Sequence, residues 1–181
     1  GDRDTARAAW EIQARDAAAT GRTQAQLRAV VQLGKVELFA GEAPDRLREA
    51  VELAHAAGSL VELAWAEENL AIGLAVLESD LAAGLSLLDR AIARARHLQL
   101  DQLAYLVAAR AMTRSYMIED VDEELAEAEA LVSSPDLLLH TTSMRGTIAL
   151  RAARWDEAIA WFERSVELAR SMPGVVPMDG I

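Results

Sequence analysis

Few side chains in this sequence stand at the spacings that catalysis or metal binding requires. The three histidines, His55, His97 and His140, lie far apart, and none belongs to an HExxH pattern, which places two zinc ligands on one helix face. Neighbouring acids such as Glu67 and Glu68 point in different directions on a helix, so they do not make an acid–base pair. Neither a GxSxG sequence nor a glycine-rich phosphate or dinucleotide loop is present. We therefore predict a protein that is not an enzyme, with no catalytic residue, no metal site and no cofactor.

The composition also limits the partners of the chain. There is no cysteine, which removes disulfides and thiolate ligands and favours a reducing compartment. The net charge of −11 would repel the phosphate backbone of a nucleic acid. The longest apolar run, residues 70–77, is far shorter than the ~20 residues that span a bilayer. We therefore expect a cytoplasmic protein whose segment contacts neither nucleic acid nor membrane directly.

The elements that must position any binding site are helices. Hydrophobic residues make up 52% of the chain but aromatic residues only 4%, and much of the apolar share is alanine, which favours closely packed helices. Apolar residues recur every three or four positions, as in Leu81, Leu85, Leu88 and Ile92. No run alternates with period two for long enough to form a strand. The sequence therefore predicts an all-α fold.

Start and stop signals divide the chain into about nine helices. Thr23 with Gln26, and Ser59 with Glu62, have the spacing of a capping box, in which each side chain satisfies a free backbone N–H group. Asp80 is a third candidate N-cap. We predict a lone helix at 5–19 followed by helix pairs near 24–57, 60–97, 102–132 and 135–171, together one repeat domain over residues 1–173, and an irregular tail at 174–181.

Small residues recur at a regular interval in alternate helices. Gly34, Gly73, Ala109 and Gly146 are separated by 39, 36 and 37 residues. A helix pair of this length cannot bury its own apolar stripe, so it must stack on a neighbouring pair. A missing side chain at the crossing lets the paired helices approach closely. The interval therefore predicts a row of stacked antiparallel helix pairs.

The last pair resembles the tetratricopeptide repeat (TPR). Gly146, Ala158 and Phe162 are separated by twelve and four residues, as in the family pattern. Thr142 stands where the family has a large aromatic residue, and Arg145 stands where it has a leucine. The resemblance implies a right-handed superhelical stack, a TPR-like α-solenoid, with a binding groove on its concave side.

The lengthened pairs, with helix ends such as residues 52–58, look like the degenerate TPR region of large LuxR-type bacterial transcriptional regulators. In those proteins an ATPase module precedes the repeats and a DNA-binding helix-turn-helix follows them. Lys35 is the only lysine among 18 basic residues, a bias that GC-rich bacterial codons produce. The chain also begins without methionine, and we expect it to be a piece of a larger protein.

The TPR resemblance implies that the first helix of each pair lines the groove. One turn beyond each small residue a side chain should face it, and most of these side chains are cationic, which suits a carboxylate or phosphate. Alternatively, the arginines pair with nearby acids such as Glu67, Glu68 or Glu119 and stay solvated. The positions implied for the groove are Lys35, Arg110, Thr113, Arg114, His140, Ser143, Thr147 and Arg151.

Three tryptophans, Trp65, Trp155 and Trp161, are predicted to fill space between repeats, because large rings usually do so. An exposed Trp161 would instead mark a docking face. The end of a repeat stack exposes an apolar surface that normally meets the next repeat, so we expect such ends to allow a homodimer.

Three functions follow from these patterns. The first is a sensor or interaction domain of a bacterial transcriptional regulator, in which a protein, a peptide or a small effector occupies the groove and takes part in signal transduction. The second is a free-standing TPR adaptor that mediates protein–protein interaction. The third is an all-α enzyme, which would bring several acids or histidines with strongly shifted pKa values into one cavity. We favour the first.

Overall fold

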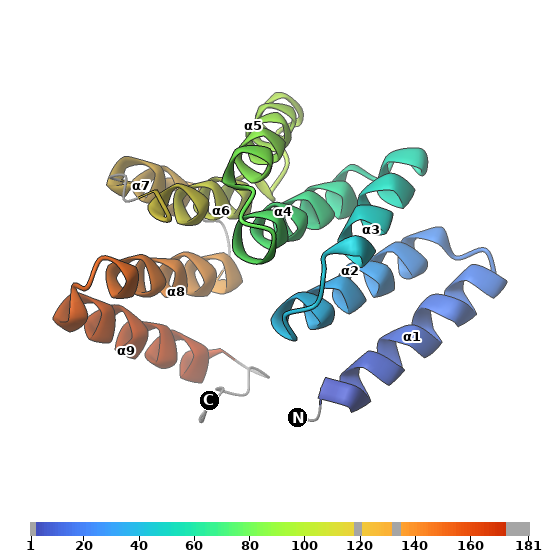
Figure 1. Cartoon of the computed structure of the whole chain (residues 1–181), viewed down its shortest axis with the longest axis horizontal. Coiled ribbons are helices and arrows are strands. Elements are labelled where there is room, and N and C mark those ends of the chain that lie inside the picture. Colours follow the sequence, from blue (N-terminus) through green and yellow to red (C-terminus); the bar gives the residue numbers. More distant parts are fainter. Residues whose placement is uncertain (1–2, 118–120, 132–134, 173–181) are drawn as a thin grey trace. The chain divides into compact units, whose positions relative to one another are not determined.

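The computed structural model describes residues 3–117, 121–131 and 135–172, so the predicted tail at 174–181 lies outside the described residues (Figure 1). Within the described ranges the chain forms helices and no strand, which confirms the all-α prediction. The helix ends lie within two residues of the limits predicted for the lone helix and the four pairs. The helices are α1 (Arg3–Ala19), α2 (Thr23–Phe39), α3 (Asp45–Ala56), α4 (Leu60–Leu77), α5 (Leu81–Leu98), α6 (Leu103–Ser115), α7 (Asp122–Ala130), α8 (Pro135–Arg151) and α9 (Trp155–Ser171).

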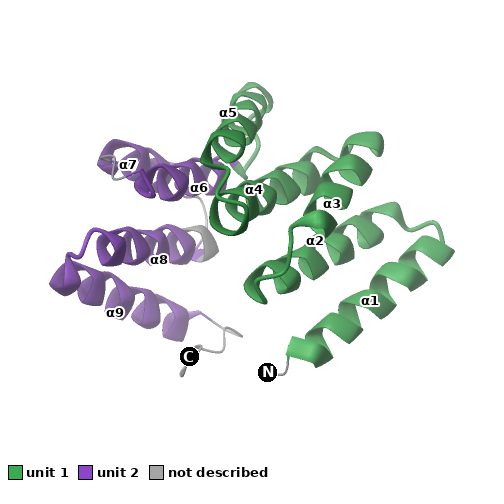
Figure 2. Ribbon diagram, viewed as in Figure 1, with its two compact units in different colours: residues 1–102 green, residues 103–181 purple. Residues whose placement is uncertain are grey.

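The chain divides into two compact units (Figure 2), residues 1–102 with α1–α5 and residues 103–181 with α6–α9. In unit 1 each helix packs on the next one along the chain, and α2 also contacts α4. In unit 2, α6 contacts α7 and α8, and α8 contacts α7 and α9. Within each unit, short connections place consecutive helices side by side, as expected for helix pairs.

Two of the predicted small residues lie where paired helices touch. A Cβ atom on Gly34 of α2 would come within 2.6 Å of the Leu47 side chain on α3. A Cβ atom on Gly146 of α8 would come within 2.7 Å of the Phe162 ring on α9. Because real contacts of this kind are longer, a side chain at either position would require the neighbouring Leu47 or Phe162 side chain to move.

Gly73 of α4 serves a different contact. A Cβ atom there would come within 2.8 Å of Pro44, which precedes α3. Gly73 therefore allows α4 to pack closely on the preceding helix pair, and it does not serve the contact of α4 with its own partner, α5. The α4–α5 crossing depends instead on Gly84 of α5, whose Cβ atom would lie 2.8 Å from the Ala71 carbonyl oxygen. The remaining small positions, Ala109 and Ala158, are buried.

Of the three N-caps predicted from the sequence, the structure shows one. The Oδ1 atom of Asp80 accepts a hydrogen bond from the Ala83 N–H group (2.9 Å), which confirms this N-cap. The capping box predicted at Thr23 is wrong, because α2 is preceded by Arg22 and Thr23 is its first helical residue. The box predicted at Ser59 is also wrong, because the Ser59 hydroxyl donates to the Glu62 carboxylate and caps no backbone group.

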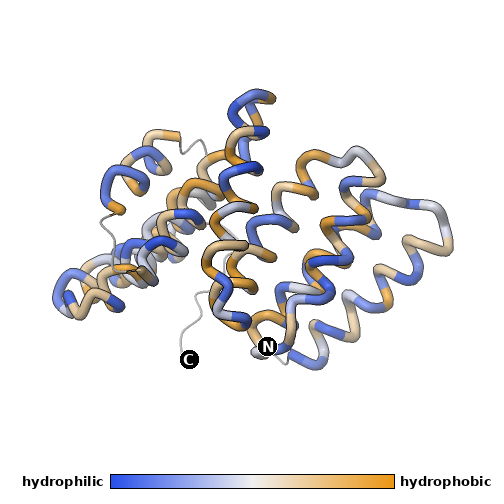
Figure 3. Tube along the Cα trace, turned by 45° about the horizontal axis from the view of Figure 1, so that its top comes forward, coloured by the Kyte–Doolittle hydropathy of each residue, from blue (hydrophilic) through white to orange (hydrophobic). Residues whose placement is uncertain are grey.

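The core consists mainly of short aliphatic side chains, and hydrophobic residues recur along every helix (Figure 3). In unit 1 the core includes clusters around Leu27 and Val30 of α2, which pack on α3 and α4. In unit 2 it includes Ala111, Leu125 and Ile148. Such small side chains allow a close approach of helices. None of the described helices combines the length and the apolar character needed to cross a membrane.

Candidate ligand-binding site

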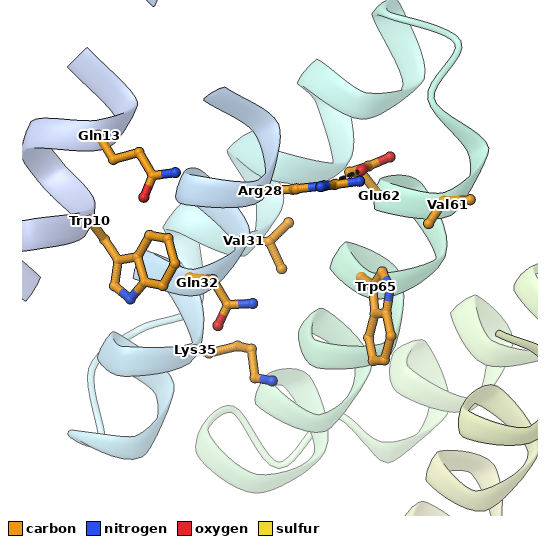
Figure 4. Close-up of a pocket in the computed structure, with 9 residues that line it drawn as sticks. All are labelled: Trp10, Gln13, Arg28, Val31, Gln32, Lys35, Val61, Glu62 and Trp65. Atoms are coloured by element: carbon orange, nitrogen blue, oxygen red, sulfur yellow. Dashed lines mark hydrogen bonds and ion pairs between the residues drawn. The ribbon is translucent and has the colours of Figure 1, made fainter. Parts of the chain in front are cut away.

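A pocket of about 420 Å³ opens on unit 1 (Figure 4). This volume lies within the roughly 300–1,000 Å³ typical of small-molecule sites. Side chains from α1, α2 and α4 line it, so the pocket brings together segments that are far apart in sequence. The lining residues are Trp10 and Gln13 of α1, Arg28, Val31, Gln32 and Lys35 of α2, and Val61, Glu62 and Trp65 of α4.

Two indole rings give the pocket its apolar walls. Trp10 and Trp65 lie on opposite sides, with Val31 between them (Figure 4). Val31 is buried in a core cluster of unit 1, and Trp65 packs against the same cluster, so this wall is held by the core. Both rings are partly buried and leave part of their surface to the pocket. The walls therefore suit a flat or apolar group.

The upper edge of the pocket in Figure 4 carries an ion pair between Arg28 and Glu62. Glu62 is nearly buried, and its carboxylate accepts hydrogen bonds from the Arg28 Nε atom (3.0 Å) and the Ser59 hydroxyl (2.5 Å). Burial alone would raise the pKa of Glu62, but these hydrogen bonds lower that pKa below its ordinary value. The Arg28 side chain is 68% exposed, so its terminal amino groups remain accessible.

Lys35 provides the second positive charge. Among the residues that the structure describes, its ammonium group makes no hydrogen bond and no ion pair within 4 Å. Its charge acts on Glu68 of α4, a buried carboxyl group. Burial raises the pKa of Glu68 to about 7, and the positive charge of Lys35 works against that increase. The pocket thus has two cationic side chains and one carboxylate, which is already bound by Arg28.

Lys35 is the predicted groove residue that lines this pocket; the others belong to unit 2. Arg110 and Arg114 of α6 both pair with Glu124 of α7, at 2.7 Å and 3.2 Å. This is the kind of pairing with acids that the sequence left open as an alternative, although the partner differs from those expected. Glu67 pairs instead with Arg94, and Glu119 lies outside the described residues.

Arg151 is held by contacts within unit 2. Its guanidinium carbon lies 3.3 Å from the centre of the Tyr116 ring, and one terminal nitrogen donates to the Ser115 hydroxyl at 3.4 Å. Burial lowers the pKa of Arg151. The side chain borders a smaller pocket of about 170 Å³ together with Ser115 and Asp122. This second pocket is less than half the volume of the first.

The other predicted groove residues make contacts inside their own helix or with a neighbour. The hydroxyls of Thr113 and Thr147 each donate to the carbonyl group four residues earlier in the same helix. Ser143 lies 2.7 Å from Ser165 of α9, oxygen to oxygen. The His140 ring is 4.8 Å from the Tyr105 ring, centre to centre. The Ser143–Ser165 and Tyr105–His140 contacts join neighbouring helices of unit 2, whereas the two threonine hydrogen bonds stay within one helix.

Sequence reasoning missed most of the pocket, including Trp10, Gln13, Arg28 and Gln32. A usable signal was present on α2, where Gln24, Arg28 and Gln32 follow one another at intervals of four and form a polar stripe. The contribution of Trp10 gave no such signal, because α1 was expected to stand outside the helix pairs.

The three tryptophans that were expected between repeats differ from one another. Trp65 is partly buried, as described above. Trp161 is also partly buried, and the guanidinium groups of Arg145 and Arg164 lie 5.2 Å and 5.6 Å from its ring centre. Trp155 is 61% exposed, so the prediction that it fills space between repeats is wrong.

Comparisons with known proteins add no family to this description. The chain matches no protein-family model, and no curated protein matches it significantly. Within the described residues, no three side chains of the metal-ligating types gather at one point. The inference of function therefore depends on the pocket and on the helix packing.

Proposed function

We propose that the chain is a non-catalytic ligand- or protein-binding domain of a larger bacterial transcriptional regulator, built as a TPR-like superhelical stack. Consecutive helix pairs with close contacts at Gly34 and Gly146 support the repeat architecture. The observation that carries the binding role is the pocket of α1, α2 and α4. Its side chains offer indole faces, amides and cations, which are groups suited to recognition.

The charges of the pocket favour an anionic ligand. Lys35 is the lining cation that makes no ion pair with another described residue, whereas the charge of Arg28 is balanced by Glu62, although the exposed guanidinium can still donate hydrogen bonds. A guanidinium and an ammonium group together suit a carboxylate. The indole walls suit an apolar group attached to it. We infer a ligand that joins a flat apolar body to a carboxylate, either a small effector or the end of a peptide.

Binding of N-acetylphenylalanine tests this ligand chemistry, with N-acetylphenylalanine amide as the matched neutral probe. Neither compound absorbs where tryptophan is selectively excited, so Trp10 and Trp65 can report on occupancy. We expect the carboxylate to change tryptophan fluorescence and raise Tm, and the amide to bind about tenfold more weakly, the equivalent of about 1.4 kcal/mol. A longer peptide with the same terminal residue distinguishes a peptide from a small effector.

Lys35→Gln should reduce the preference for the carboxylate over the amide to near unity, and Trp65→Ala should weaken the binding of both. Arg110→Ala is the matched control, because Arg110 is bound to Glu124 in unit 2. Equal binding of both probes by the parent chain, or an undiminished preference in Lys35→Gln, would contradict the assignment. The parent reading frame tests the regulator separately, since it should encode a phosphate-binding loop and a helix-turn-helix.

A further inference from the structure

Helices α2 and α4 contact one another and run in the same direction along the pocket. The Arg28 Nε atom of α2 donates to Glu62 of α4 at 3.0 Å. One turn further along both helices, Trp65 of α4 packs against the core cluster that contains Val31 of α2. The two members of each pair are 34 residues apart in sequence. The two helices therefore keep a constant register over these turns.

One more turn in this register brings Lys35 of α2 to Glu68 of α4. Glu68 follows Trp65 by three residues, so both lie on the same side of α4. Lys35 lines the pocket, whereas Glu68 is 4% exposed and is not among the lining residues. The charge of Lys35 acts on Glu68, although no ion pair joins the two side chains within 4 Å. The cation of the pocket thus has a buried carboxyl group as its neighbour.

The two carboxyl groups that α4 places beside the cations differ in charge near neutral pH. Hydrogen bonds from Ser59 and Arg28 lower the pKa of Glu62, so Glu62 stays ionised. Burial raises the pKa of Glu68 to about 7, so Glu68 changes its charge there. An ionised Glu68 offsets the charge of Lys35 and repels the carboxylate of a ligand, whereas a protonated Glu68 does neither.

The other helices packed on α4 leave this coupling to Lys35. Two of their arginines also reach α4, but each is bound by a different acid of that helix. These ion pairs are Arg48–Glu78 from α3 and Arg94–Glu67 from α5. Histidine side chains commonly titrate near neutral pH as well, but none lines the pocket. Lys35 of α2 is therefore the charged neighbour through which Glu68 can act on a ligand.

We propose that Glu68 controls the binding of anionic ligands in the pocket, because its protonated form leaves the charge of Lys35 to the ligand and its ionised form offsets that charge. This inference rests on the anion-binding function proposed above. The affinity for a carboxylate ligand should therefore fall as the pH rises through 7. The effect is reciprocal, so a bound anion favours protonated Glu68, and binding near pH 7 takes up part of a proton.

The binding of N-acetylphenylalanine and of its amide to the full chain at pH 6 and pH 8, followed by tryptophan fluorescence, tests this control. The carboxylate of the probe is ionised at both pH values. We expect it to bind about fivefold more weakly at pH 8, as one added charge on a neighbouring helix would cause. The neutral amide should bind equally at both. Calorimetry at pH 7 in two buffers of different ionisation enthalpy should show proton uptake with the carboxylate and none with the amide.

Glu68→Gln should bind the carboxylate at pH 8 as tightly as the parent does at pH 6, without proton uptake. Glu52→Gln, at an exposed position of α3, is the matched control and should behave like the parent. Circular dichroism verifies that both variants are folded. Lys35→Gln is a second, independent variant. It should bind the carboxylate weakly and about equally at pH 6 and pH 8, because without the amine Glu68 stays protonated to higher pH.

Two failures have to be told apart. Equal affinity of the parent for the carboxylate at pH 6 and pH 8, or a pH dependence that persists in Glu68→Gln, would overturn this proposal and leave the pocket assignment intact. In the second case another titrating group, such as a histidine, would be responsible. If neither probe bound at either pH, the pocket assignment would be wrong, and the control by Glu68 with it.

Discussion

The buried carboxyl group of Glu68 makes stability depend on pH at the scale of one residue. Its pKa is raised from 4.5 to about 7, mainly by burial. As the pH rises from 4.5 to 7, the unfolded chain releases this proton before the folded chain does, so the free energy of unfolding falls. Above pH 7 the contribution is constant. The interval between the two pKa values corresponds to about 3 kcal/mol.

Glu68→Gln removes this titration. We expect the variant to be more stable than the parent at pH 8, by roughly 1–3 kcal/mol, and to lose most of that advantage at pH 5. Urea unfolding followed by circular dichroism at the two pH values measures the difference. Glu52→Gln, at an exposed position of α3, is the control and should show no comparable change. An equal effect of Glu68→Gln at both pH values would contradict the explanation.

Side-chain types could be predicted from the sequence, but their partners could not. The sequence placed cations at Lys35, Arg110 and Arg114, and it raised the alternative that arginines pair with acids. It did not indicate Glu124 as the shared partner, because that acid lies on the next helix and its direction depends on how α6 and α7 pack. The pairing of Arg28 with Glu62 joins positions 34 residues apart for the same reason.

At the scale of the element, a glycine that contacts the backbone of a neighbouring helix should tolerate substitution by alanine less well than a glycine that contacts a side chain. A Cβ atom on Gly84 would meet the Ala71 carbonyl oxygen, whereas one on Gly146 would meet the Phe162 ring, which is partly exposed and can rotate outward. We expect Gly84→Ala to lower the free energy of unfolding by roughly 1–3 kcal/mol, and Gly146→Ala to cost less because better helix propensity offsets it.

Thermal and urea unfolding of the two variants measure this order. Ala82→Gly, at an exposed position beside Gly84, calibrates the effect of helix propensity alone at about 1 kcal/mol. The opposite order, with Gly146→Ala more damaging than Gly84→Ala, would show that the Phe162 ring is held more firmly than its exposure indicates.

The helix limits were predictable because local signals determine them. Asp80 caps α5, and Gly58 adopts the left-handed conformation beyond the end of α3. The packing was harder to predict, because the interval between small residues does not show which neighbouring helix packs against each of them. Gly73 admits the preceding pair through Pro44, while Gly84, outside the interval, serves the α4–α5 crossing. Ser59 caps no backbone N–H group because its hydroxyl donates to the Glu62 carboxylate instead.

At the scale of the whole molecule, composition was sufficient for the fold class and insufficient for the site. Scarce aromatics, abundant alanine and the absence of alternating runs predicted an all-α chain, which the described residues confirm. The pocket joins Trp10 to Trp65 across three helices, and no local pattern connects positions that far apart. The largest part of the proposed function therefore depends on long-range packing.

Lys35 has a practical consequence for studying this protein. It is the only lysine in the sequence, and it lines the pocket. An amine-reactive acylating reagent therefore has one side-chain target, besides the terminal amine. We expect mass spectrometry to show slower acylation of Lys35 when N-acetylphenylalanine is bound, with the terminal amine as internal reference. A dye attached there would place a reporter at the pocket without any change of sequence.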